Sequence, residues 1–184
     1  MSVGTATLRY PVALIHPLTL ADGRRVLVRP VLPQDSAGEQ AFVKGLSPAS
    51  RYRRFHVGMR ELPPSTLQQM TEIDHRSHVA LVAHPELDID EAEDPVIVAD
   101  ARYVRLDGRR AEFAVAVDDR WQRQGLGGRL LRMLARHAAK NGLDTLYGDV
   151  LADNLPMITM LQRWGCELRP RDDEAGLLLA TIVL

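Results

Sequence analysis

Cysteine is nearly absent from this chain of 184 residues, which contains only Cys166. A single cysteine excludes an intramolecular disulfide and a cysteine-based zinc cluster, and no metal cofactor is expected. Lysine is almost as rare, because Lys44 and Lys140 are the only lysines among 23 basic residues. We attribute this arginine bias to overall composition, since most surface arginines simply need solvation.

An excess of charge of one sign is also missing. The 23 basic and 24 acidic residues give a net charge of −1. General nucleic-acid binding is not expected, because it requires a basic excess. No apolar run approaches the ~18 residues that span a bilayer, and residues 1–20 lack the apolar core of a secretory signal. We expect a cytoplasmic protein without a membrane partner, either a monomer or a homodimer.

The order of predicted elements indicates a mixed α/β sheet in one domain. A strand is expected over residues 24–31, helices follow near residues 36–46, 48–55 and 65–70, and strand-forming runs occupy residues 78–83, 95–106 and 110–117. Asp107-Gly108 predicts a hairpin turn between the last two. A long helix over 124–141, a strand over 146–151, a helix over 154–163 and strands over 166–168 and 177–184 complete the domain. The domain is expected over residues 22–184, after an irregular N-terminal arm at residues 1–21.

Two local expectations concern burial and charge. The apolar face of the helix near residues 36–46 is predicted to contain Ala37, Ala41, Phe42 and Leu46. Six acidic residues between positions 86 and 94 predict a solvated loop. The alternative for that loop is the attraction of a cationic partner.

The most informative segment is a strand that runs into a polar loop and a glycine cluster, residues 114–129. Gly125, Gly127 and Gly128 open the long helix, where free N–H groups and the helix dipole form an anion site. The alternative is merely a tight strand-to-helix turn. The Walker A motif does not fit, because Arg129 follows the glycines instead of Lys and Ser or Thr. The dinucleotide fingerprint does not fit either.

The pattern Gln122-x-x-Gly125-x-Gly127 after a valine-rich strand resembles the acetyl-CoA pyrophosphate motif of the GCN5-related N-acetyltransferase (GNAT) superfamily. Residues 150–154 and 164–166 resemble the next strand, its asparagine-initiated helix and the terminal glycine of that superfamily. The resemblance covers residues 110–169. It implies a GNAT-like domain with a mixed, mostly antiparallel twisted sheet flanked by helices.

A narrower similarity extends over residues 46–55, 73–74, 80–83 and 111–115. These segments are similar to the catalytic domain of bacterial protein-lysine acetyltransferases. The similarity implies an acyltransferase that moves an acetyl group from acetyl-CoA directly to an amine, either a protein lysine or a small-molecule amine. The competing hypothesis is a catalytically weak acyl-CoA-binding sensor domain.

The resemblance also implies positions for the cofactor. Val115 and Val117 are expected to pair with the pantetheine amides, and an N–H near Val117 to polarise the thioester carbonyl. Asn154 is expected to anchor the pantetheine arm, although it equally suits a helix N-cap. The pyrophosphate is assigned to Gln122, Arg123, Gln124, Gly125, Leu126, Gly127, Gly128 and Arg129.

Two carboxylates are the catalytic candidates. Glu112 begins an otherwise apolar strand, and the resemblance implies that it acts as the general base; the alternative is a strand-end carboxylate paired with Arg110 or another arginine. Asp149 is the second candidate, on the neighbouring strand. The chain departs from the superfamily at Leu161, where many members have a tyrosine that acts as general acid. Thiolate is a tolerable leaving group without that acid.

The nature of the acceptor depends on which charged groups face the groove. Arg51, Arg53 and Arg54 disfavour a polycationic acceptor if they face it. The acidic loop favours such an acceptor if it faces the groove instead. The sequence leaves both possibilities open.

Overall fold

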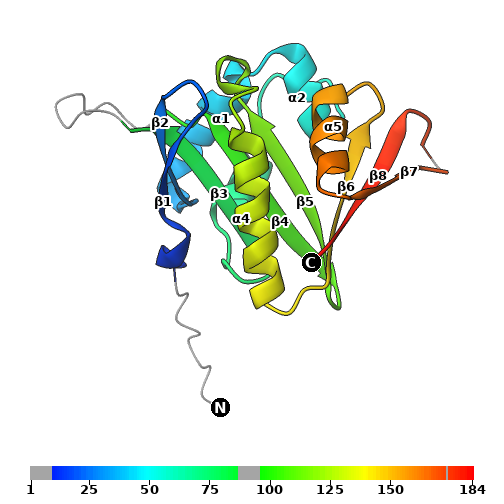
Figure 1. Cartoon of the computed structure of the whole chain (residues 1–184). Helices are drawn as coiled ribbons and strands as arrows, with labels where there is room; N and C mark the ends of the chain where they lie inside the picture. Colours follow the sequence, from blue (N-terminus) through cyan, green and yellow to red (C-terminus); the bar gives the residue numbers. More distant parts are fainter. Residues whose placement is uncertain (1–9, 87–95, 173) are drawn as a thin grey trace.

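The computed structural model describes residues 10–86, 96–172 and 174–184. Within them, eight strands form one sheet in the order β1-β2-β3-β4-β5-β6-β8-β7 (Figure 1). Every neighbouring pair is antiparallel except β5 and β6, which are parallel. The strands are β1 His16–Thr19, β2 Arg25–Pro30, β3 His78–Pro85, β4 Ala99–Asp107, β5 Arg110–Val117, β6 Thr145–Leu151, β7 Glu167–Pro170 and β8 Leu177–Val183.

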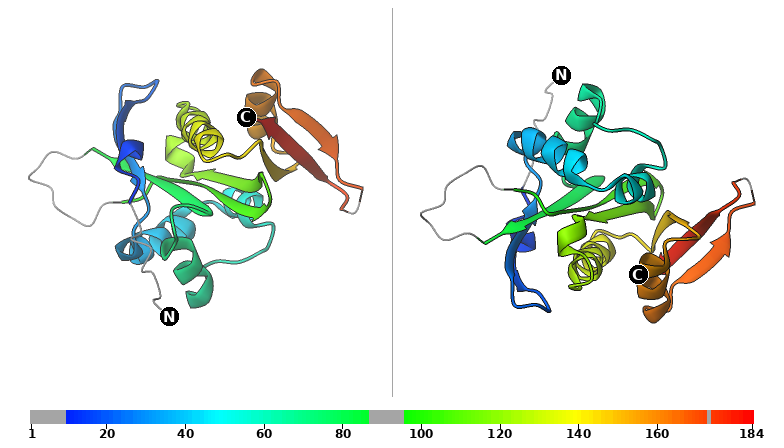
Figure 2. Two further views of the ribbon diagram at one scale, coloured as in Figure 1. Left: turned by 90° about the horizontal axis from the view of Figure 1, so that it is seen from below. Right: turned by 90° about the horizontal axis from the view of Figure 1, so that it is seen from above.

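The helices form two layers on opposite faces of this sheet (Figure 2). One face carries α1 (Ser36–Gly45), α2 (Pro48–Phe55) and α3 (Pro64–Thr71), and the other carries α4 (Leu126–Lys140) and α5 (Leu155–Arg163). Short 3₁₀ turns lie at Val12–Leu14, Pro33–Asp35 and Asp119–Trp121. No helix in the described part of the chain is long and apolar enough to cross a membrane. The expected mixed, mostly antiparallel sheet flanked by helices is confirmed.

Strand alternation divides the core between the two faces. In β3, Leu81 packs into the cluster under α4, whereas Ala80 and Val82 pack into the cluster under α1 and α3. Successive side chains of a strand point to opposite faces, so a strand covered on both sides is apolar throughout. The hairpin predicted at Asp107-Gly108 is confirmed, because Asp107 pairs with Arg110 across it.

The predicted buried face of α1 is partly wrong. Phe42 and Leu46 are buried as expected, but Ala37 and Ala41 are exposed. Glu39 is fully buried in their place. Its carboxylate accepts a hydrogen bond from Arg102 of β4, and this charged partner on a distant strand makes the burial tolerable.

The expected irregular N-terminal segment is wrong for residues 16–19, which form β1 and pair with β2. Leu14 and Leu20, on either side of this strand, are buried in the core. Most of the predicted acidic loop, residues 87–94, lies outside the described residues, so its solvation is not tested.

The feature that positions the site is the divergence of β5 from β6. Their pairing starts at Arg110 and Thr145 and ends at Glu112 and Tyr147. At the next position of β6, a Cβ on Gly148 would lie 2.8 Å from the backbone oxygen of Phe113. Only glycine permits this approach, after which the two strands separate and leave a gap in the sheet.

Candidate active site

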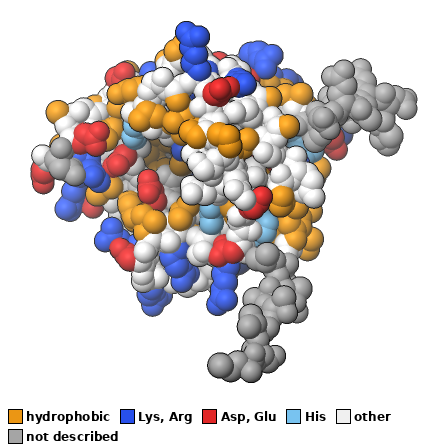
Figure 3. Space-filling view, turned by 180° about the vertical axis from the view of Figure 1, so that it is seen from behind, with side chains coloured by type: hydrophobic (Ala, Val, Ile, Leu, Met, Phe, Trp, Pro, Cys, Tyr) orange, Lys and Arg blue, Asp and Glu red, His pale blue; other side chains and the backbone are white. Residues whose placement is uncertain are grey.

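A cleft of about 650 Å³ occupies the gap between β5 and β6. Its walls come from α2, β5, the loop before α4, β6 and α5. The face opposite α4 is hollowed, with hydrophobic and charged side chains around the hollow (Figure 3). Eleven of the thirteen residues assigned to the site from the sequence line this cleft: Glu112, Val115, Val117, Gln122, Arg123, Gly125, Leu126, Gly127, Gly128, Asp149 and Asn154.

The two remaining residues, Gln124 and Arg129, are not in the cleft wall. The backbone oxygen of Gln124 accepts a hydrogen bond from the N–H of Ala21 at 3.4 Å. Arg129 lines an adjoining cavity, and its Nη1 donates to the backbone oxygen of Thr19 at 2.6 Å. Both residues therefore tie the loop and the start of α4 to the segment around β1 and β2.

The loop before α4 has the geometry of an anion site. Gly125 is the N-cap of α4 with φ of +82°, a left-handed conformation that favours glycine. The first bond of the helix runs from the N–H of Arg129 to the oxygen of Gly125 at 3.1 Å. The N–H groups of Leu126, Gly127 and Gly128 precede it and have no acceptor within the helix, so they are available to a ligand.

The loop is held in place by contacts with α2. Nε2 of Gln122 donates to the backbone oxygen of Val117 at 3.0 Å and to Oγ of Ser50 at 3.1 Å. The Asp119 carboxylate accepts from Ser50 Oγ at 2.7 Å, and from the N–H and Oγ of Ser47 at 2.9 and 2.8 Å. Partial burial raises the pKa of Asp119, but these hydrogen bonds outweigh it and lower that pKa overall. The Gln122 amide therefore helps to hold this loop in position, and the sequence did not indicate this contact.

The edge of β5 offers free backbone groups to the cleft. The N–H of Asp118 donates to the oxygen of Val98 in the approach to β4. In an antiparallel pair such bonds alternate, so the backbone groups of Val115 and Val117 point toward β6. Since pairing with β6 has ended at Glu112, Val115 can bond an extended ligand through both groups and Val117 through its N–H.

Glu112 and Asp149 both line the cleft, but their environments differ. Asp149 forms an ion pair with Arg171 at 3.4 Å. Glu112 forms no ion pair with any described residue, and Arg110 lies instead over the ring of Tyr147, with 4.9 Å from its Cζ to the ring centroid. The alternative pairing of Glu112 with Arg110 is not observed; the charge of Glu112 instead acts on Arg54, where it opposes the lowering of the arginine pKa by burial.

Four arginines surround the outer end of the cleft. The adjoining cavity of about 620 Å³ shares Arg123 and Arg163 with the cleft and adds Arg129 and Arg132. The Arg132 guanidinium lies 5.1 Å from the ring centroid of Trp164. We call this cavity, which Arg123, Arg129, Arg132 and Arg163 line, the arginine cavity. Sequence reasoning missed Arg132 and Arg163, because they lie on different helices and only the packing of α4 against α5 brings them together.

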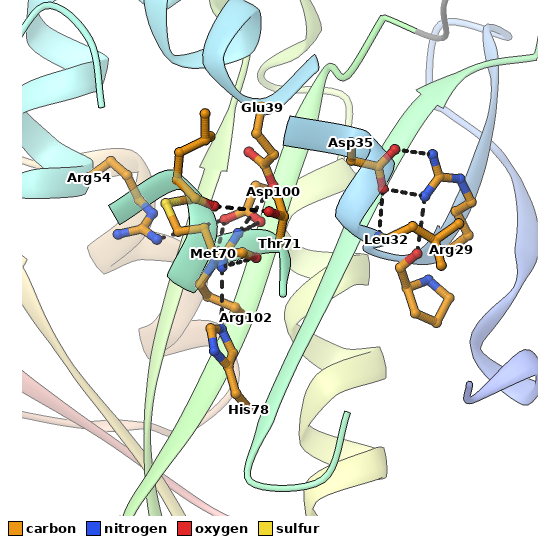
Figure 4. Close-up of polar contacts among 12 residues, drawn as sticks. Arg29, Leu32, Asp35, Glu39, Arg54, Met70, Thr71, His78, Asp100 and Arg102 are labelled. Atoms are coloured by element: carbon orange, nitrogen blue, oxygen red, sulfur yellow. Dashed lines mark hydrogen bonds and ion pairs between the residues drawn. The ribbon is translucent and has the colours of Figure 1, made fainter. Parts of the chain in front are cut away.

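A buried ionic network lies behind the cleft (Figure 4). Arg102 donates to both oxygens of Asp100, to Glu39 at 3.1 Å and to the backbone oxygen of Met70 at 3.0 Å. Arg54, which lines the cleft, lies 3.8 Å from Asp100. Burial and the nearby Asp100 raise the pKa of Glu39 well above its ordinary value. No sequence pattern predicted this network.

Two residues of α5 complete the site description. Oδ1 of Asn154 accepts from the N–H of Met157 at 3.4 Å, so Asn154 is the N-cap of α5 while it also lines the cleft. Leu161 is fully buried in the core and is not part of the cleft wall. The position at which many superfamily members have tyrosine therefore contributes packing in this chain.

Comparison with known proteins assigns the fold and the family. Residues 47–166 match the model of the acetyltransferase (GNAT) family. Acetyltransferase PA5475 of Pseudomonas aeruginosa is 35% identical over 140 residues, which cover 76% of this chain and 73% of that protein.

Solved structures agree with this assignment. The GNAT domain of S. lividans PAT is 25% identical, with a TM-score of 0.84, and covers 96% of this chain and 100% of that domain. YncA from Salmonella typhimurium, solved with its cofactor acetyl-CoA, has the same fold at 16% identity and a TM-score of 0.67. That match covers 86% of this chain and 94% of YncA.

Proposed function

Because this chain belongs to the acetyltransferase (GNAT) family, we propose that it transfers an acetyl group from acetyl-CoA directly to an amine. The acceptor is a protein lysine or a small-molecule amine. One observation supports this most strongly. A single cleft has the helix N–H groups of an anion site at one end and the carboxylate of Glu112 at the other.

The donor substrate fits the groups that line the cleft. Acetyl-CoA supplies the acetyl thioester, and its pyrophosphate suits the N–H groups of Leu126, Gly127 and Gly128 together with Arg123. The pantetheine amides suit the free backbone groups of Val115 and Val117, where an amide chain can pair as an added strand. The arginine cavity lies next to the pyrophosphate end and provides further positive charge.

Glu112 is proposed to act as the general base. A lysine ammonium has a pKa of about 10.4 and must lose a proton before its nitrogen can attack. The Glu112 carboxylate accepts that proton, directly or through a water molecule. The amine nitrogen then bonds to the thioester carbonyl carbon, the carbon–sulfur bond breaks with the sulfur leaving as thiolate, and the nitrogen releases its second proton to solvent or to that thiolate. The N–H of Val117 is proposed to polarise the carbonyl oxygen.

Asp149 is proposed to have a secondary role on the acceptor side, since Arg171 already compensates its charge. Protonation of the thiolate needs no strong acid, because an ordinary thiol has a pKa of about 8.5. The buried Leu161 is therefore compatible with turnover. Tyr147 or a water molecule can supply the proton.

Thiol release from acetyl-CoA in the presence of an amine panel tests this function. The panel should include lysine peptides, amino acids and simple diamines, and acetyl-CoA binding should be measured in parallel by calorimetry. The proposal predicts amine-dependent thiol release and an acetylated product detected by mass spectrometry. Tight binding of acetyl-CoA without turnover on any amine would contradict it and favour the sensor hypothesis.

A further inference from the structure

The acceptor side of the cleft, around Glu112, is lined by three basic side chains. Glu112 lies on the sheet face opposite α4. Ala116 of the same strand is four residues away and therefore shares this face, and it packs into the cluster under α1 and α3. On the same face, α2 contributes Arg53, Arg54 and His56 to the cleft wall. The three basic side chains therefore share the compartment in which an amine must approach Glu112.

Among the described residues of this compartment, Arg53 carries a positive charge that no carboxylate partner balances. Arg53 is half-buried and forms no ion pair with a carboxylate in residues 10–86, 96–172 or 174–184. The charge of Arg54 is partly balanced by Asp100 at 3.8 Å, and Asp149 is balanced by Arg171. Among the described residues of the cleft wall, Glu112 forms no ion pair within 4 Å and Asp149 Oδ1 has no hydrogen-bond partner, and the mechanism needs Glu112 for the proton.

His56 provides a second, independent observation. Its Nε2 is buried and has no hydrogen-bond partner among the described residues, although the ring lines the cleft. The residue ends α2 in a left-handed conformation with φ of 55°, which is uncommon outside glycine. Buried polar atoms in native proteins are nearly always paired, and the His56 ring has to turn for this nitrogen to meet a polar group of a ligand in the cleft.

Arg51 does not belong to this surface. Its Nη1 donates to the backbone oxygens of Val43, Lys44 and Leu46, and it thereby closes the end of α1. Of the three arginines whose orientation the sequence left open, Arg53 and Arg54 line the cleft and Arg51 does not.

We propose that the acceptor is an amine with a carboxylate close to it, and that Arg53 and His56 bind that carboxylate while the amine faces Glu112. This inference rests on the proposed function. A carboxylate can take both a guanidinium fork and an imidazole N–H. A polycationic acceptor would instead place like charges beside Arg53 and Arg54. The carboxylate can belong to an acidic residue beside a protein lysine or to a free amino acid.

The test compares matched acceptors with acetyl-CoA as donor. One arm uses blocked tripeptides in which lysine is flanked by aspartate, alanine or arginine, and the other compares an ω-amino acid with its amide. We expect kcat/KM to be about tenfold or more higher for the aspartate-flanked peptide than for the arginine-flanked one. The two arms distinguish a protein source of the carboxylate from a small-molecule source.

Variants at Arg53 make the test specific. Arg53→Gln should bring the aspartate- and arginine-flanked peptides to within about twofold of each other, and Arg53→Glu should reverse the preference. Arg60→Gln is the matched control, because Arg60 is exposed and lies outside the cleft. Circular dichroism of each variant verifies that it folds.

The possible failures are distinguishable. Equal rates with all three peptides together with equal rates for the ω-amino acid and its amide, or an acidic preference that survives Arg53→Glu, would overturn this inference and leave the acetyltransferase function intact. Absence of thiol release with every acceptor would overturn the proposed function and this inference with it.

Discussion

At the scale of single residues, the site depends on which charges have partners and which do not. Glu112 forms no close ion pair among the described residues, although its charge acts on Arg54, whereas Asp149 is paired with Arg171. A candidate base could be chosen from the sequence because strand alternation places Glu112 at the start of an apolar strand. The partner of Asp149 could not be chosen, because Arg171 lies beyond the following helix.

The buried network at Arg102 shows the same limit. Arg102 is 4% exposed and lies in a strand whose sequence alternates between apolar and polar residues. Its burial depends on Asp100 in the same strand and on Glu39 from α1. A charged residue is buried only with its partners, and one of those partners is 63 residues away along the chain.

The pH dependence of stability is predicted from His78, whose Nε2 lies 3.3 Å from Nη1 of Arg102. Burial, followed by the Arg102 charge, lowers the pKa of His78 to about 4. In the unfolded chain a histidine has a pKa of about 6.5, so between these values the unfolded state binds an extra proton. The free energy of unfolding should therefore decrease as the pH falls from about 6.5 to about 4.

His78→Gln removes this titration and keeps a hydrogen-bond acceptor for Arg102. Urea unfolding at about pH 7 and about pH 4.5 should show a smaller loss of stability in the variant than in the unchanged chain. An equal loss in both proteins would show that His78 does not titrate as stated.

At the scale of elements, the divergence of β5 and β6 determines where the cleft lies. The helices and most strands could be predicted, because periodicity and caps are local properties. β1 was missed because it has four residues and contains Pro17. The divergence itself was not predicted, since no local sequence pattern determines where two strands stop pairing.

Gly148→Ala tests the close approach that precedes the divergence. The added Cβ would lie 2.8 Å from the Phe113 oxygen, so we expect a loss of about 1–3 kcal/mol in unfolding free energy and a higher KM for acetyl-CoA. Gly45→Ala is the control, because its Cβ meets nothing within 4 Å. Equal stability of the two variants in urea unfolding would contradict the role given to Gly148.

At the scale of the whole molecule, the near-neutral net charge conceals an uneven distribution of charged residues. The net charge of −1 includes four arginines in one cavity next to the anion site. Of these four arginines, the sequence motif assigned only Arg123 and Arg129 to the pyrophosphate site. It could not bring Arg163 of α5 to the same place, because that requires the packing of two helices.

Arg132→Gln is predicted to weaken acetyl-CoA binding by about fivefold to tenfold, since a charge-assisted contact is lost. The dissociation constant can be measured by titration calorimetry at low and moderate salt, with a smaller salt dependence expected in the variant. Arg136→Gln on the same helix is the control, because Arg136 is exposed and lines neither cavity. Equal dissociation constants for the two variants would remove the arginine cavity from the donor site.

The most direct test of the central claim is turnover by Glu112→Gln with acetyl-CoA and a reactive amine. The account predicts that kcat falls by about 100-fold or more, because a general base contributes at least that much, while the dissociation constant of acetyl-CoA stays within about twofold. Glu167→Gln, a strand carboxylate on β7 paired with Arg169, should retain full activity. An unchanged kcat in Glu112→Gln would contradict the account.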